Sequence, residues 1–157
     1  MIFLEIPDIP GESQVEAYAD QIEVSTWGWN VSNSKTMHKG KGGSASEAFF
    51  GDVIVTKGVD SSSHLLGQKC ATGTQIPEAF LHCCKLGDDN EVLEYFTIEM
   101  KKVVVRSVDF SGAESVSSET ISLNFEEFMV KYVGQEDDGT GGAEKEWPWN
   151  IAKKTAP

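Results

Sequence analysis

The chain lacks the long apolar run that a membrane-spanning helix requires. Such a helix needs about 18 or more consecutive apolar residues. Hydrophobic residues make up 39% of the 157 residues, and none of their runs approaches that length. This composition predicts a globular protein with a single domain, residues 1–157, and no membrane insertion. The N-terminus has no basic region and its apolar stretch stops at Pro7. We therefore expect synthesis in the cytoplasm without a cleavable signal peptide.

Basic residues are also scarce in this sequence. Lys and Arg number 13 against 25 Asp and Glu, which gives a formal net charge of −12. A chain of this charge repels a phosphate backbone, and no basic cluster with interleaved aromatic residues offsets the repulsion. The sequence therefore predicts that nucleic acid is not a partner.

Cysteines are few, and they are odd in number. Cys70, Cys83 and Cys84 lie in apolar surroundings, which favours free thiols over a disulfide framework. A metal site could combine His82 and Cys84 with Cys70 or His64, but no CxxC or HExxH spacing supports one. Buried cysteines and a hydrogen-bonded histidine are the favoured interpretation. We expect no metal, no cofactor and no enzymatic activity.

The four tryptophans form two pairs on alternate positions, Trp27 with Trp29 and Trp147 with Trp149. A strand projects alternate residues to the same side, so each pair should lie on one face of a sheet. Indoles in this pattern are usually buried or interface anchors. We expect them to anchor the wall of the fold, which leaves Gly28 and Asn30 on the opposite, open face.

Apolar periodicity predicts a mainly β fold. Strand patterns cover residues 49–59 and 78–86, and a very long hairpin joins 95–110 to 120–133. The apolar face changes sides at residues 25–26 and again at 126–127, as in a sheet that coils upon itself. One helix is expected over 64–71, between an Asp-Ser cap and Gly73. We predict a small closed β-barrel of two packed antiparallel sheets with one short flanking α-helix.

A long segment from Asn33 to Ser46 is rich in Ser, Gly and Lys and has no apolar periodicity. Connections of this length in a compact protein are usually functional. We expect a long extended loop that makes contacts with a partner. The candidate contact residues are Lys35, Thr36, Met37, His38, Lys39, Gly40 and Lys41.

The order and spacing of several short motifs resemble Hcp, the haemolysin-coregulated protein family of type VI secretion systems. No single motif is specific, but together they span nearly the whole chain. The motifs are Gly11-Glu12-Ser13, Ile22-Glu23-Val24, Trp27-Gly28-Trp29, Lys35-Thr36-Met37-His38, Lys57 with Asp60-Ser61-Ser62, Glu94-Tyr95, residues 120–125, Val130-Lys131-Tyr132 and residues 149–153.

The resemblance implies a β-barrel that forms homohexameric rings, which stack into the inner tube of a contractile injection machine. It implies partners in the spike, the contractile sheath, the baseplate and secreted effectors. It also places Gly28 and Asn30 toward the bore, where they would contact effectors, and assigns ring stacking to the loop after Asn33. Many relatives carry a small hydroxyl residue where this chain has Gly28.

Two other interpretations remain open from the sequence. A monomeric β-domain could use its aromatic strands to bind a small ligand or a carbohydrate. A metal-dependent enzyme could use His82 and Cys84. The tube protein is the interpretation that the sequence favours.

Overall fold

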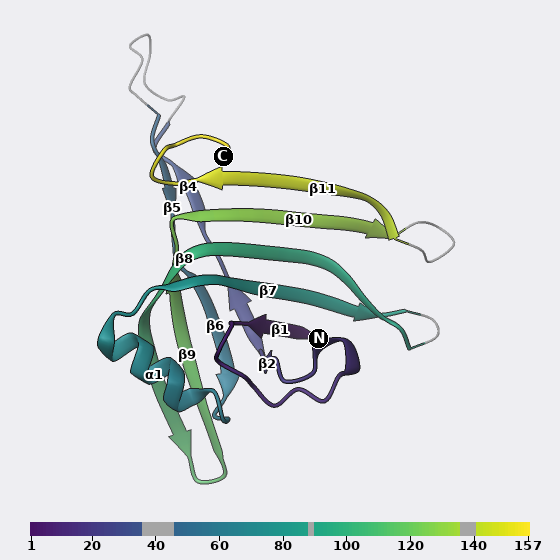
Figure 1. Cartoon of the computed structure of the whole chain (residues 1–157), viewed down its shortest axis with the longest axis vertical. Helices are drawn as coiled ribbons and strands as arrows, with labels where there is room; N and C mark the ends of the chain where they lie inside the picture. The colour runs from purple at the N-terminus through teal and green to yellow at the C-terminus, as the bar shows by residue number, and fades with distance from the viewer. Residues whose placement is uncertain (36–45, 88–89, 136–140) are drawn as a thin grey trace.

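The computed structural model describes residues 1–35, 46–87, 90–135 and 141–157. Two sheets cross each other, and one helix lies beside them (Figure 1). In chain order the elements are β1 (Ile2–Glu5), a 3-10 turn (Glu16–Tyr18), β2 (Ile22–Glu23), β3 (Thr26–Gly28), β4 (Val31–Asn33), β5 (Ala48–Phe50), β6 (Val53–Gly58), α1 (Ser63–Thr72), β7 (Ile76–Leu86), β8 (Val92–Ala113), β9 (Val116–Asn124), β10 (Glu127–Gln135) and β11 (Gly141–Asn150).

Strand β8 is 22 residues long and belongs to both sheets. Its first half pairs with β7 and β10. These strands, together with β1, β2 and β11, form sheet A. Its second half pairs with β9, which continues through β6 to β3 as sheet B. The strand turns between the sheets at Lys102, whose φ of 55° is in the left-handed region. The predicted long hairpin is confirmed, because β9 and β10 together return along β8.

The segment that holds the first tryptophan pair forms a second corner between the sheets. The Val24 amide donates to the Ile2 carbonyl of sheet A at 3.0 Å, whereas the Ser25 amide donates to the Thr56 carbonyl of sheet B at 2.8 Å. The backbone therefore changes sheets between Val24 and Ser25. This change is the physical cause of the face switch seen in the sequence.

The prediction of a closed barrel is wrong. Among the described residues, the hydrogen-bonded path runs from β2 through β1, β7, β8, β9 and β6 to β3 and does not return to its start. Strands β2 and β3 are consecutive in the chain, but each pairs with a different sheet. The two sheets are joined there by a covalent corner, and the strand edges stay open. The mainly β class, the two packed antiparallel sheets and the flanking helix are confirmed.

The core lies between the inward faces of the two sheets. Sheet B contributes Val53, Val55, Ile121 and Leu123, and sheet A contributes Leu4, Leu81, Ile98 and Met100. All eight are completely buried. Each buried side chain of this size contributes about 1.5–3 kcal/mol. This core fixes the two sheets against each other, so that their outward faces are held in place.

Helix α1 begins after Asp60, whose carboxylate accepts hydrogen bonds from the Ser62 amide at 2.9 Å and from the Ser62 hydroxyl at 2.5 Å. It ends at Gly73, which has a φ of 64° and donates its N–H to the Cys70 carbonyl. Leu66 is completely buried and anchors the helix to the sheets. No helix of the described ranges is long and apolar enough to cross a membrane.

Candidate assembly surfaces

The outward face of sheet B is rich in hydroxyl groups, and we call it the hydroxyl face. Two rows of paired residues cross its four strands, because paired positions lie side by side. One row runs Thr26, Thr56, Thr120, Asp109 and the next runs Gly28, Ile54, Ser122, Ser107. The Thr56 and Thr120 hydroxyls lie 3.4 Å apart. Such a face offers many adaptable hydrogen-bonding groups and little charge.

The first tryptophan pair points away from this face, and Gly28 and Asn30 are exposed. Trp27 stacks on Phe96 with 5.6 Å between ring centroids. Trp29 donates its indole N–H to the Gly51 carbonyl at 3.0 Å. A Cβ added at Gly28 would meet nothing within 4 Å. A side chain at position 28 would therefore project into open space on the hydroxyl face.

The second tryptophan pair lies on the inward face of β11 and joins Trp29 in an aromatic cluster. The ring of Phe128 lies edge-on to both Trp29 and Trp147, with 4.9 Å between centroids in each case. Trp149 packs near Phe50 with 6.3 Å between centroids. Trp147 keeps 41% of its surface exposed because β11 is an edge strand that pairs only with β10 among the described strands.

A groove opens between β11 and the hairpin formed by β4 and β5, and we call it the aromatic groove. Its volume is about 300 Å³. The residues that line it are Val31, Ser32, Asn33, Ala48, Phe50, Trp147 and Trp149. Just beyond, Lys35 is exposed and donates its backbone N–H to the Asn33 side chain at 2.8 Å. The other predicted stacking residues, Thr36 to Lys41, lie outside the described residues.

A fixed negative charge stands beside the hydroxyl face at Asp52. Its carboxylate accepts hydrogen bonds from Ser122 at 2.7 Å and Asn124 at 2.8 Å, and lies 3.4 Å from the Arg106 guanidinium. Burial pushes the pKa of Asp52 up, but the hydrogen bonds and Arg106 outweigh burial and hold the pKa below its usual value. Asp52 is therefore ionised at neutral pH.

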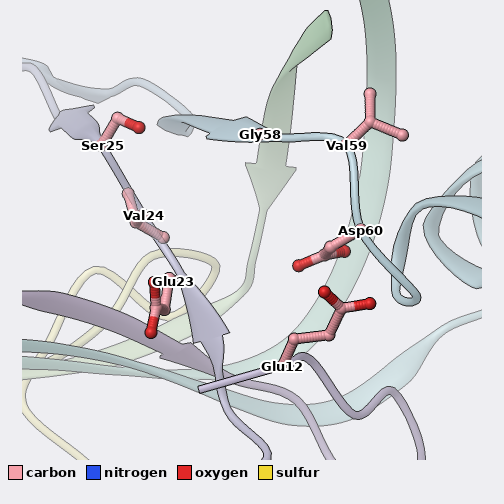
Figure 2. Close-up of a pocket in the computed structure, with 7 residues that line it drawn as sticks. All are labelled: Glu12, Glu23, Val24, Ser25, Gly58, Val59 and Asp60. Carbon is pink, nitrogen blue, oxygen red and sulfur yellow. The ribbon is translucent and has the colours of Figure 1, made fainter. Parts of the chain in front are cut away.

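A second cleft, of about 250 Å³, carries three carboxylates, Glu12, Glu23 and Asp60 (Figure 2). It lies between the loop after β1, strand β2 and the connection from β6 to α1. Glu12 accepts a hydrogen bond from the Ser61 amide at 3.0 Å, and Lys57 lies 2.8 Å from Asp60. The three acids come from distant parts of the sequence, so no local pattern predicted this cleft.

His82 lies between two carboxylates on the outward face of sheet A. Its Nδ1 is 2.5 Å from Glu94 and its Nε2 is 3.3 Å from Glu5. Tyr18 donates its hydroxyl to the same Glu94 carboxylate at 3.1 Å. Burial lowers the pKa of His82, but the two carboxylates outweigh burial and raise the pKa above its usual value. Both ring nitrogens are thus engaged by protein groups.

The cysteines are free, and burial raises the pKa of the Cys83 thiol to about 11. Cys83 is therefore a protonated thiol at neutral pH. Within the part of the chain that the structure describes, no three His, Cys, Asp or Glu side chains are grouped to hold a metal ion. The structure does not bring His82, Cys84, Cys70 and His64 together as a metal site.

The His82 contacts predict a pH dependence of stability. Below about pH 6.5, the ordinary histidine pKa, the imidazole is charged in both the folded and unfolded chains, and the contribution of its contacts is fully present. As the pH rises through the raised pKa of the folded protein, this contribution is lost. We expect a loss of about 1 kcal/mol, because both carboxylate partners are partly exposed. Urea denaturation over a pH series measures it.

His82→Gln serves as the comparison for that series, because a neutral amide cannot gain or lose a proton. Its free energy of unfolding should change less between pH 6 and 9 than that of the parent protein. Equal pH profiles for the two proteins would show that the charge on His82 contributes nothing.

Comparisons with known proteins connect this geometry to a family. The family model described as "Type VI secretion system effector, Hcp" matches residues 3–132. The protein hcp1 of Pseudomonas aeruginosa is 38% identical over 153 residues, covering 96% of this chain and 94% of its own length. The chain belongs to the Hcp family. The resemblance seen in the sequence is thereby confirmed.

Solved structures agree with the Hcp assignment. The crystal structure of Hcp1 from Salmonella typhimurium superimposes with a TM-score of 0.79 at 27% identity, covering 98% of this chain and 96% of that one. A type six secretion system protein gives a TM-score of 0.89 at 24% identity, with 98% and 97% covered, and shows the shared fold. The comparisons support a type VI secretion role and do not support a monomeric ligand-binding or carbohydrate-binding domain.

Proposed function

We propose that this Hcp protein assembles into closed homohexameric rings that stack into the inner tube of a type VI secretion machine. The observation that supports the proposal is the presence of two open edges in sheet B. Among the described residues, its two outer strands are each paired on one side only. One open edge is β3, and the other is β8 from Val104 to Ala113. An open strand edge presents unpaired backbone groups that another chain can pair with.

The two edges are complementary in direction. Neighbouring strands of sheet B are all antiparallel, so β8 and β3 run in opposite directions across its four strands. Rotation about an axis parallel to the strands places the β8 edge of one copy beside the β3 edge of the next copy. The two strands that meet there are again antiparallel. Repeated rotation closes a ring, as in cyclic assemblies. The number six comes from the family resemblance.

In this ring the hydroxyl face lines the bore, and Gly28 and Asn30 face the effectors that pass through it. The outward face of sheet A then lies on the outer circumference. That face carries an ion pair between Lys131 and Glu99 at 2.7 Å. A charged outer face suits contact with water and with the contractile sheath. Spike and baseplate would meet the ends of the stack. The chain acts as a structural component in this arrangement and catalyses no reaction.

Mass photometry and negative-stain electron microscopy of the purified chain at micromolar concentration test the proposal. We expect closed rings, and a map of them should place sheet B around the central channel with Gly28 facing inward. A strictly monomeric particle at high micromolar concentration would contradict ring assembly. Rings with Gly28 on the outer circumference would contradict the orientation alone.

A further inference from the structure

The aromatic groove is a large apolar surface at one end of the molecule. None of its seven lining residues carries a charge, in a chain with a formal net charge of −12. Trp147 and Val31 in its wall each keep 41% of their surface exposed, and Phe49 beside it keeps 63%. Exposed apolar patches of this kind mark contact surfaces, with aromatic residues as anchors.

A second apolar feature lies at the opposite end. The end of the β8–β9 hairpin, which we call the β8–β9 turn, carries Phe110 of β8, which is 62% exposed, and Val116 of β9, which is 67% exposed. The longest axis of the molecule runs from the β4–β5 hairpin at the top of Figure 1 to this turn at the bottom. Phe110 and Val116 lie on opposite faces of the hairpin, because Phe110 pairs with Glu119 and Val116 with Ala113. A projecting hairpin end with an exposed apolar side chain on each face is shaped to enter a groove.

We propose that the β8–β9 turn of a copy in one ring docks into the aromatic groove of a copy in the next ring. This inference rests on the proposed ring and assigns its stacking contact to two described surfaces. Stacking of rings in one direction is a head-to-tail contact, which pairs two different patches at opposite ends of the subunit. The groove and the turn are two such patches.

Position and charge favour this pairing. The β8–β9 turn is the lower end of sheet B in Figure 1, and the β4 wall of the groove follows β3 of the same sheet toward the top. Like charges destabilise close contact between acidic rings. The groove carries no charge, so Glu114 at the tip of the turn would meet no carboxylate among its lining residues. Phe110 acts as the anchor, because burial of an exposed aromatic side chain gives the largest gain.

Engineered cysteines test the contact directly. The variant carries Ala48→Cys in the groove and Val116→Cys in the turn, with Cys70→Ser to remove the half-buried native thiol. After mild oxidation, we expect disulfide-linked chains on a non-reducing gel and multi-ring tubes by electron microscopy. The two single-cysteine variants should give no disulfide-linked chains, because each lacks one of the two partner thiols. Disulfides confined within single rings, or no disulfides at all, would overturn the inference.

A second set of variants tests the proposed anchor itself in the double-cysteine protein. Phe110→Ser, placed in the double-cysteine protein, should lower the fraction of multi-ring particles by about tenfold or more while single rings persist. Ile54→Ser is the matched control, because Ile54 is 46% exposed on the hydroxyl face. Its tubes should form as before. Unchanged tubes with Phe110→Ser would overturn the inference, whereas a chain that forms no rings would overturn the proposed function itself.

Discussion

Replacing Lys57 with Met is expected to lower the free energy of unfolding by about 3–5 kcal/mol. Lys57 is completely buried, and its ammonium group contacts the carboxylate of Glu119, which is buried as well. The same nitrogen donates to Asp60 and to the Gly58 carbonyl, each at 2.8 Å. Removal of the ammonium group leaves the buried carboxylate of Glu119 with only the Ser63 hydroxyl, which donates to it at 2.7 Å, and the loss of its buried cation causes the destabilisation.

Two further variants separate the ion pair from the volume of the side chain. The double variant Lys57→Met with Glu119→Leu should recover most of the lost stability, because a well-packed apolar pair replaces the ion pair. Lys102→Met removes an ion pair at the surface, which solvent screens, and should cost far less than Lys57→Met. Urea denaturation followed by circular dichroism measures all three. A loss below 1 kcal/mol for Lys57→Met would show that the pair does not stabilise the fold.

The buried pair illustrates what sequence reasoning missed in the fold. Lys57 was noted as part of a family motif, but nothing local shows that a lysine in a strand points inward. Its partner, Glu119, lies 62 positions away. Alternation identified the long hairpin and both face switches, because side-chain period is a local property. Barrel closure depends on which distant strands pair, and the sequence carries no local signal for that.

The candidate surfaces were likewise predictable from the sequence only where neighbouring residues define them. Alternate spacing placed Trp27 and Trp29 on one face and Gly28 on the other, because a strand fixes that relation within three residues. The acidic cleft and the aromatic groove are assembled from segments far apart in the chain. Trp147 and Trp149 were predicted as wall residues, yet their role in the groove appears only when β11 lies beside the β4–β5 hairpin.

Trp29→Ala is expected to destabilise the fold by about 3 kcal/mol or more, by analogy with other large-to-small substitutions of aromatic residues. Trp29 lies at the centre of the aromatic cluster, with Phe125, Phe128 and Trp147 each within 6.0 Å between ring centroids. Its indole also donates to the Gly51 carbonyl. The amide of the same glycine donates to the Asn30 carbonyl at 2.8 Å. Truncation therefore opens a cavity and leaves a carbonyl unpaired.

Two comparisons divide this loss between packing and hydrogen bonding. Trp29→Phe keeps an aromatic ring but removes the donor, and it should cost about 1 kcal/mol for the hydrogen bond in addition to a smaller packing loss. Trp147→Ala should cost less than Trp29→Ala, because 41% of the Trp147 side chain is already exposed. Thermal and urea denaturation provide the measurement. If Trp147→Ala proved the more harmful, the cluster would be centred on β11 and the groove, and Trp29 would be its periphery.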